Sequence, residues 1–251
     1  VANMSDGRLN LAPIEIARVR LDRPFRQALE NDYDRTVVRL ASQAGVNFRA
    51  YDRDHNGRLT QDEVAVLVLT APLGGSGQTR PRIGGLQVDG VRFDGGFLVS
   101  FADELSDINT YAHELLHGVA STIDIYGPTC VSYRQTVMSC STDGDLAPIG
   151  LDPWHKMRSG WDEPHVRSTA TPGSISLRSG RDTVLLHDPA LGVGEYFLVE
   201  YRNPRHDLYD SGSARQGVTV WYVGTNDRGD LLGLTWPPPV EIIDGQLSAW
   251  A

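Results

Sequence analysis

Residues 106–124 read SDINTYAHELLHGVASTID, and the expected architecture is built around this segment. Apolar residues recur at helical spacing after Ser106, a residue type that caps helices well, so we predict a helix here. His113 and His117 are four residues apart, a spacing that directs both imidazoles to one side of a helix. An H-E-x-x-H segment is typical of zinc sites in which the glutamate, here Glu114, activates a water molecule. The alternative interpretation is a helix with two surface histidines.

A catalytic zinc ion takes a third protein ligand and keeps one position open for water. Our candidate is Asp124, seven residues after His117, and it requires the helix to end soon after Val119 so that the chain bends back. Asp143 and Asp145 are the reserve candidates. The alternative for Asp124 is a loop carboxylate that accepts hydrogen bonds from backbone amides.

A second metal-type pattern occupies residues 52–63, which read DRDHNGRLTQDE. Calcium loops offer oxygen ligands at positions 1, 3, 5, 7 and 12, with a glycine at position 6 for the sharp turn. The ligand positions carry Asp52, Asp54, Asn56, Arg58 and Glu63. Because a single loop is present and a strand-like run follows it, we predict a structural calcium ion rather than a calcium sensor. The alternative is an aspartate-rich turn that binds no ion.

The composition excludes several classes of protein. The chain has 251 residues, a formal net charge of −9 and 40% hydrophobic residues, which is typical of a globular protein with one large domain or a domain with an appendage. An acidic balance argues against a nucleic-acid partner, whose phosphates attract clustered lysine and arginine. No apolar run in the sequence approaches the ~18 residues that a membrane span needs.

The apolar pattern indicates an α/β fold class with α+β character. We expect a helix between Pro24 and Gly45, a strand buried on both faces at 64–69, strands at 97–101, 183–186, 196–201 and 218–223, and a short helix at 152–160. Residues 165–176 are expected to be a loop-like boundary. We therefore predict a catalytic core at 1–164, with a mixed sheet over two main helices, and a β-rich lobe at 165–251 packed as part of the same unit.

Four blocks of the chain, spread over residues 46–223, resemble the secreted zinc metalloproteases of the immune inhibitor A type. The blocks are residues 46–57 (VNFRAYDRDHNG), the H-E-x-x-H helix with its downstream Asp124-Ile125-Tyr126, residues 137–140 (VMSC) with WHK at 154–156 and GW at 160–161, and the segments 196–202 (YFLVEYR) and 217–223 (GVTVWYV). Only the H-E-x-x-H helix is specific alone, and the order and spacing of the blocks carry the likeness.

The resemblance implies a zincin-like metalloprotease fold and a secreted zinc-dependent endopeptidase that acts on proteins or peptides. It implies zinc on His113, His117 and Asp124, with Glu114 as general base and Met138 beneath the metal in a Met-turn-like bend. We expect the protein to be a monomer. The alternatives are a catalytically inactive calcium-binding interaction module of the same fold, and a zinc hydrolase of a non-peptide substrate.

The chain departs from the family pattern H-E-x-x-H-x-x-G-x-x-D. Ala120 stands in place of the glycine, and Asp124 comes one residue late. Since glycine at that point eases a left-handed turn, the chain must turn another way to reach Asp124.

Two pairs of residues follow Asp124 in the sequence and belong to the same region. Cys130 and Cys140 can close a loop of about ten residues as a disulfide, worth ~2–3 kcal/mol and implying an oxidising compartment, and zinc–thiolate ligation is the alternative. Tyr126 and Tyr133 are candidates for donating a hydrogen bond to an oxyanion in the transition state, and packing is the alternative.

Overall fold

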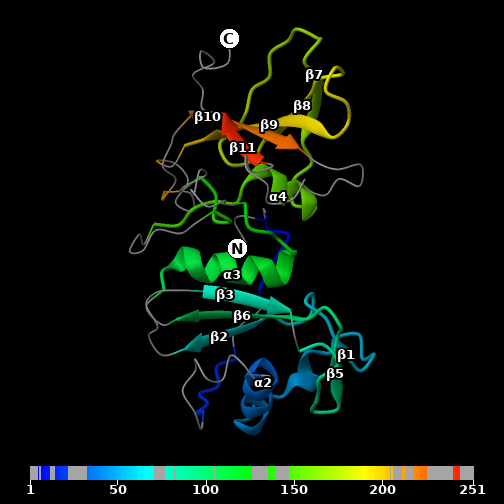
Figure 1. Cartoon of the computed structure of the whole chain (residues 1–251), viewed down its shortest axis with the longest axis vertical. Helices are drawn as coiled ribbons and strands as arrows, with labels where there is room; N and C mark the ends of the chain where they lie inside the picture. The colour runs from blue at the N-terminus through cyan, green and yellow to red at the C-terminus, as the bar shows by residue number, and fades with distance from the viewer. Residues whose placement is uncertain are drawn as a thin grey trace. The chain divides into compact units, whose positions relative to one another are not determined.

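The structure is a computed structural model, and it describes residues 5, 7–11, 15–21, 33–70, 77–81, 83–103, 106–125, 135–139, 147–203, 205, 211–212, 217–224 and 240–243. These residues form a mixed α/β fold, as predicted (Figure 1). The chain divides into two compact units, one of Leu11–Ser106 with Thr110–Ser121, the other of Val1–Asn10, Asp107–Asn109 and Thr122–Ala251. No helix in the described part of the chain is both long and apolar enough to cross a membrane.

The first unit is built on a three-stranded mixed sheet in the order β2-β6-β3, formed by β2 (Val66–Thr70), β6 (Leu98–Asp103) and β3 (Gly77–Pro81). Strand β2 pairs with β6 in parallel, and β3 pairs with β6 antiparallel. The predicted mixed sheet is thus confirmed for this part of the chain.

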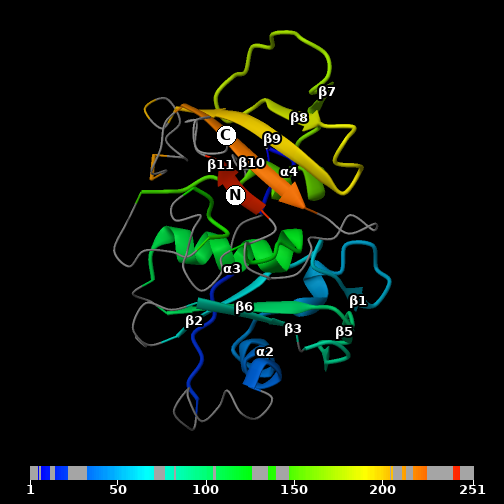
Figure 2. The ribbon, with the colours of Figure 1, turned by 45° about the horizontal axis from the view of Figure 1, so that its top comes forward.

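Two helices, α2 (Tyr33–Gln43) and α3 (Ile108–Ala120), cover opposite faces of this sheet (Figure 2). Strand β6 serves both faces because its successive side chains alternate. Phe101 packs toward α2, with its ring centroid 5.6 Å from that of Tyr33. Ser100 points to the other face, where its hydroxyl donates a hydrogen bond of 2.7 Å to the carbonyl oxygen of Glu114 in α3.

The core of this unit lies between α2 and the sheet. Its buried side chains are Tyr33, Val37, Val38, Val46, Phe48, Leu59, Ile83, Leu86, Val91, Phe93, Phe97, Val99 and Phe101. Each large apolar side chain removed from water in this way contributes ~1.5–3 kcal/mol before the entropic cost of folding is counted. The same cluster anchors α2 and the strands that lead to α3.

The prediction that residues 64–69 form a strand buried on both faces is wrong in its burial. Strand β2 is parallel to β6, but it lies at the sheet edge, and the side chain of Leu69 is 57% exposed. An unbroken apolar run is typical of a central parallel strand, and here it occupies an edge.

The helix boundaries agree with the predictions within the described residues. Helix α2 ends at Gln43, and Gly45 follows with a left-handed φ of +108°, as a helix stop requires. Helix α3 begins at Ile108, so the cap position is Asp107 rather than the predicted Ser106. It ends at Ala120, close to the predicted end.

A small sheet in the order β1-β5-β4 carries the loop at 52–63. It consists of β1 (Arg58–Leu59), β5 (Val91–Phe93) and β4 (Gln87–Val88), and a 3-10 helix η1 (Phe48–Tyr51) leads into the loop. Strand β1 pairs in parallel with β5, and the side chain of Leu59 is fully buried. The loop is therefore fastened to the core at its midpoint.

The second unit contains a five-stranded sheet in the order β11-β10-β9-β8-β7, in which only β7 and β8 are parallel. Its strands are β7 (His165–Ser168), β8 (Thr183–His187), β9 (Glu195–Arg202), β10 (Gly217–Gly224) and β11 (Val240–Ile243). Helix α4 (Pro153–Arg158) lies beside β9 (Figures 1 and 2).

The strands predicted at 183–186, 196–201 and 218–223 are confirmed as β8, β9 and β10, and the short helix predicted at 152–160 as α4. Residues 165–168, expected in a loop, instead form β7. Because β7 is an edge strand with mostly exposed side chains, it lacks the apolar alternation that predicts a strand. The division predicted at residues 164–165 stays a prediction.

Candidate metal centre

Helix α3 presents two different faces to its surroundings. Glu114 and Gly118, one turn apart, face the sheet, since a Cβ added to Gly118 would lie 3.5 Å from the hydroxyl oxygen of Ser100. His113 and His117 precede these two residues by one position each, which turns the imidazoles about 100° around the helix axis. The four-residue spacing within each pair thus separates a face that packs on the sheet from a face that carries the two imidazoles.

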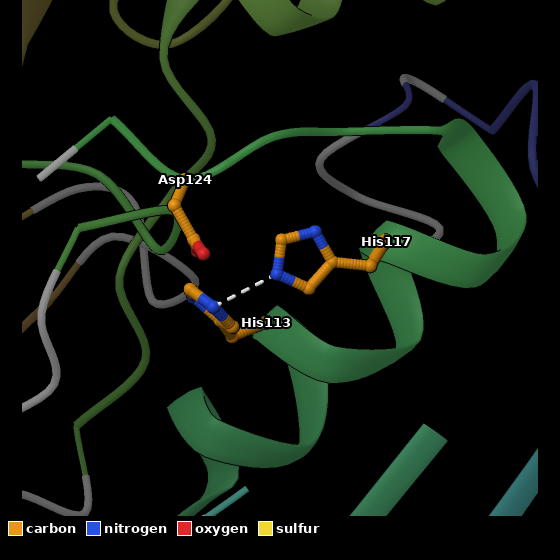
Figure 3. Close-up of side chains that lie close together, drawn as sticks. All are labelled: His113, His117 and Asp124. Carbon is orange, nitrogen blue, oxygen red and sulfur yellow. Dashed lines mark hydrogen bonds between the residues drawn. The ribbon is translucent and has the colours of Figure 1, made fainter. Parts of the chain in front are cut away.

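The two imidazoles converge on one point (Figure 3). Their Nε2 atoms are 3.0 Å apart and share a hydrogen bond, and their rings are nearly perpendicular at 86°. The carboxylate of Asp124 faces them from the segment after the helix, and the three ligand atoms all lie within 4.8 Å of one another. The structure therefore brings together the three residues that the sequence predicts as zinc ligands.

This geometry fits a zinc ion. Two imidazole nitrogens on a tetrahedral zinc at about 2.0–2.1 Å are separated by about 3.3 Å, a few tenths more than the observed 3.0 Å. Two nitrogens and one carboxylate oxygen are a ligand set that zinc accepts with a fourth position left for water. His113 is buried, whereas His117 and Asp124 are partly exposed.

The turn to Asp124 is made by Ser121, whose φ is +50°, in the left-handed region. The family pattern separates its glycine from its aspartate by three residues, and Ser121 precedes Asp124 by the same three residues. The left-handed turn is therefore present, displaced by one residue together with the aspartate. A side chain in this conformation costs ~1–2 kcal/mol relative to glycine.

Glu114 is buried, and strand β3 holds its carboxylate in place. The hydroxyl of Thr79 lies 2.8 Å from Oε2 of Glu114 and 2.8 Å from the carbonyl oxygen of Glu114, so both atoms are acceptors within reach of its one proton. Thr79 and Ser100 are paired across β3 and β6, so both face α3. A Cβ on Gly77 would lie 2.7 Å from Cγ and Oε1 of Glu114, so any larger residue there would have to displace the Glu114 side chain.

The segment that carries Asp124 is fixed on both sides by backbone hydrogen bonds. The N–H of Ile123 donates to Nε2 of His155 at 3.2 Å, and the N–H of Ile125 donates to the carbonyl of Met138 at 3.2 Å. Met138 is fully buried. Its predicted position beneath the metal stays a prediction, and its backbone contact with the Asp124 segment is observed.

His155 is in turn held by a buried carboxylate. Nδ1 of His155 lies 2.7 Å from Oδ2 of Asp152, and the hydroxyl of Thr136 donates to the same oxygen at 2.7 Å. Burial alone raises the pKa of Asp152, but the interactions with His155 and Thr136 outweigh it and lower the pKa to about 2. Asp152 is therefore an ionised acceptor in the interior at neutral pH.

Strand β9 supports the bend around Met138. Arg202 is buried, its guanidinium donates to the carbonyl oxygen of Gln135, and its Nε lies 2.7 Å from Oε1 of Glu200. Trp221 of β10 also donates to Glu200, at 2.9 Å. The ion pair thus ties β9 to the segment that leads to Met138.

The carboxylates of the loop at 52–63 also converge, with one oxygen each from Asp52, Asp54 and Glu63 within 4.8 Å of one another. The Asp52 carboxylate accepts the N–H groups of Asn56 at 3.0 Å and Gly57 at 2.9 Å. Gly57, at position 6, has a φ of +77°, as the sharp turn requires. The loop therefore has the backbone shape that the calcium pattern predicts.

Two further features of this loop match the pattern. The Glu63 carboxylate folds back to accept the N–H of Arg53 at 2.9 Å and of Thr60 at 3.0 Å, and the Asn56 side chain accepts the N–H of Arg58 at 2.7 Å. Calcium loops usually contain a short strand that pairs with the same strand of a second loop. Here that strand is β1, and it pairs with β5 instead. Burial of Leu59 in β1 completes the anchor.

Several predicted site residues lie outside the described residues. They are Cys130 and Cys140 of the predicted disulfide, the reserve ligands Asp143 and Asp145, and the candidate proton donors Tyr126 and Tyr133. The sequence reasoning did not identify Thr79, Asp152 or His155 as parts of the site. For His155 the available signal was its place in the WHK block.

Comparisons of the chain with protein-family models, with curated proteins and with solved structures find no match.

Proposed function

We propose that the protein is a zinc-dependent endopeptidase in which His113, His117 and Asp124 hold the ion. The observation that carries the proposal is the convergence of the two Nε2 atoms, 3.0 Å apart, on one side of α3 with the Asp124 carboxylate facing them. Zinc, when bound, polarises both a water molecule and the carbonyl that the water attacks. The likeness of the four sequence blocks to secreted metalloproteases of the immune inhibitor A type supports a protein or peptide substrate.

Glu114 is the proposed general base. It lies between the two histidines in the helix, next to His113, and its carboxylate, 2.8 Å from the Thr79 hydroxyl, accepts a proton from the attacking water. The same carboxyl then delivers that proton to the departing amine. Thr79 and Gly77 fix the position of the carboxylate during both transfers.

We also propose that the loop at 52–63 binds a structural calcium ion through Asp52, Asp54, Asn56, Glu63 and the backbone of Arg58. The support is the convergence of three carboxylates and the left-handed turn at Gly57. The loop follows η1 and contains β1, whose Leu59 is buried in the core of the first unit, so an ion there stabilises the platform on which α3 packs. We further propose a secreted, monomeric protein.

Hydrolysis of casein and of a small ester, each with and without a zinc chelator, tests the proposed activity. We expect chelator-sensitive casein hydrolysis, and we expect Glu114→Gln to bind zinc normally while reducing the rate by about 10²–10⁴-fold, the usual contribution of a general base. Glu195→Gln, which changes a partly buried glutamate in β9, is the matched control and retains the rate. A zinc-loaded Glu114→Gln protein with an unchanged rate contradicts the proposal, and hydrolysis of the ester alone favours a non-peptide hydrolase.

A further inference from the structure

A buried chain of hydrogen bonds runs from Thr136 through Asp152 and His155 to the backbone N–H of Ile123. Asp152 is fully buried, and His155 is 1% exposed. Because the Ile123 N–H can only donate, Nε2 of His155 must accept and therefore carries no proton. The ring proton is then on Nδ1, where it donates to Oδ2 of Asp152 at 2.7 Å.

The two oxygens of Asp152 have separate tasks. Oδ1 accepts the backbone N–H of His155 at 3.0 Å, which caps the first turn of α4. Oδ2 accepts from the His155 ring and from Thr136. The helix cap and the orientation of the histidine ring can therefore be changed independently, because an asparagine at this position still caps the helix with its oxygen but carries an NH2 donor in place of the second acceptor.

We propose that Asp152 and His155 form a positioning pair for Asp124: Asp152 fixes the tautomer of His155 so that its Nε2 holds the N–H of Ile123, the residue before Asp124. The inference rests on the proposed function, in which Asp124 is the third zinc ligand. The second hydrogen bond, from Ile125 to Met138, fixes the other side of Asp124, so its Cα is held between two buried anchors.

The consequence is a gain in zinc affinity, because a ligand already held in place loses less conformational freedom on binding. Residues that orient metal ligands in this way typically change metal affinity by 10–100-fold. A pair that merely filled the interior would change the stability of the fold and leave the zinc affinity of the folded protein unaltered.

The test measures the zinc dissociation constant of the full chain by competition with a chromogenic chelator near neutral pH. In Asp152→Asn the side-chain NH2 donates to Nδ1 of His155, which moves the ring proton to Nε2. Nε2–H and the Ile123 N–H are then two donors that face each other, and the hydrogen bond between them is lost. We expect zinc to bind 10–100-fold more weakly in Asp152→Asn and in His155→Phe. His155→Gln keeps an acceptor where Nε2 lies, and we expect it to bind zinc within a few-fold of the wild type.

Two additional variants separate this inference from the proposed function. Asp124→Ala must itself weaken zinc binding, and adding His155→Phe to it must cause no further loss if the pair acts through Asp124. The visible spectrum of the cobalt-substituted protein gives a second readout of the coordination geometry, and it should change in Asp152→Asn as in Asp124→Ala.

Unchanged zinc affinity in folded Asp152→Asn, with Asp124→Ala weakened, overturns the positioning role and leaves the proposed function standing. Unchanged affinity in Asp124→Ala overturns the proposed ligand set and the inference with it. Circular dichroism and thermal unfolding without metal establish that each variant is folded, and Asp152→Asn decides the matter if His155→Phe does not fold.

Discussion

The two groups of metal-type side chains in this chain are built in different ways. The loop at 52–63 holds its carboxylates through hydrogen bonds from its own backbone, within one short stretch of sequence. The group of His113, His117 and Asp124 joins a helix to the turn that follows it, and its supports come from β3 and from His155 in α4. A local motif therefore specifies the loop almost completely, whereas the other group depends on residues that no short motif contains.

The largest expected effect is the loss of zinc binding in His117→Ala. Residues that only orient ligands cost 10–100-fold in metal affinity, so removal of a ligand nitrogen should cost more than about 100-fold. Asp52→Ala, in the other group, should leave the zinc dissociation constant unchanged. Isothermal titration of both variants with zinc measures the difference. An equal loss of zinc affinity in the two variants would mean that the loop at 52–63 and the group of His113, His117 and Asp124 are energetically coupled.

Calcium should act on stability rather than on zinc affinity. Calcium at about 100 times its dissociation constant should stabilise the fold by ~2.7 kcal/mol, which raises the melting temperature of a chain of this size by about 5–10 °C. Asp52→Ala should remove that shift because its carboxylate holds the Asn56 and Gly57 amides. Identical melting curves of the wild type in calcium and in chelator would rule out the structural ion.

Strand β3 should influence catalysis without influencing zinc binding. In Gly77→Ala the new Cβ meets the side chain of Glu114 at 2.7 Å, and displacement of a catalytic group by about 1 Å costs up to about 100-fold in rate. Gly95→Ala, where a Cβ meets nothing within 4 Å, is the matched control. Steady-state kinetics should show a 10–100-fold lower kcat for Gly77→Ala at an unchanged zinc content. A normal kcat in that variant would mean that Glu114 does not act as the general base.

The smallest expected effect concerns the displaced turn. Ser121→Gly relieves a left-handed residue and should stabilise the protein by ~1 kcal/mol, whereas Ala120→Gly places glycine in the helix and should destabilise it by ~0.5–1 kcal/mol. Thermal unfolding of the two variants gives the sign of each change. Opposite signs to those expected would place the turn at residue 120, as in the family pattern.

Much of this fold could be predicted because its elements carry local signals. The strands at 183–187, 195–202 and 217–224 and the helix around His113 follow apolar periodicity, and the turn at Gly57 follows from its position in the loop. Strand β7 could not be predicted, since its exposed edge position leaves no apolar alternation to detect. The exposure of Leu69 was missed because burial of a strand depends on its neighbours rather than on its own residues.

The candidate site shows the same limit. The convergence of His113 and His117 follows from helical spacing, and Asp124 was proposed because a zinc site would need a third ligand nearby. The contacts of Glu114 with Thr79 and of Ile123 with His155 join residues more than thirty positions apart, so no spacing rule can reveal them. Ser121 could not be assigned to the left-handed turn because the family pattern placed glycine one residue earlier.

Anomalous scattering across the zinc absorption edge, from crystals of the zinc-saturated protein, tests the central claim most directly. The account predicts a zinc peak at about 2.0–2.2 Å from Nε2 of His113, Nε2 of His117 and a carboxylate oxygen of Asp124. A zinc peak on Cys130 and Cys140 instead, or none at the two histidines, would contradict it.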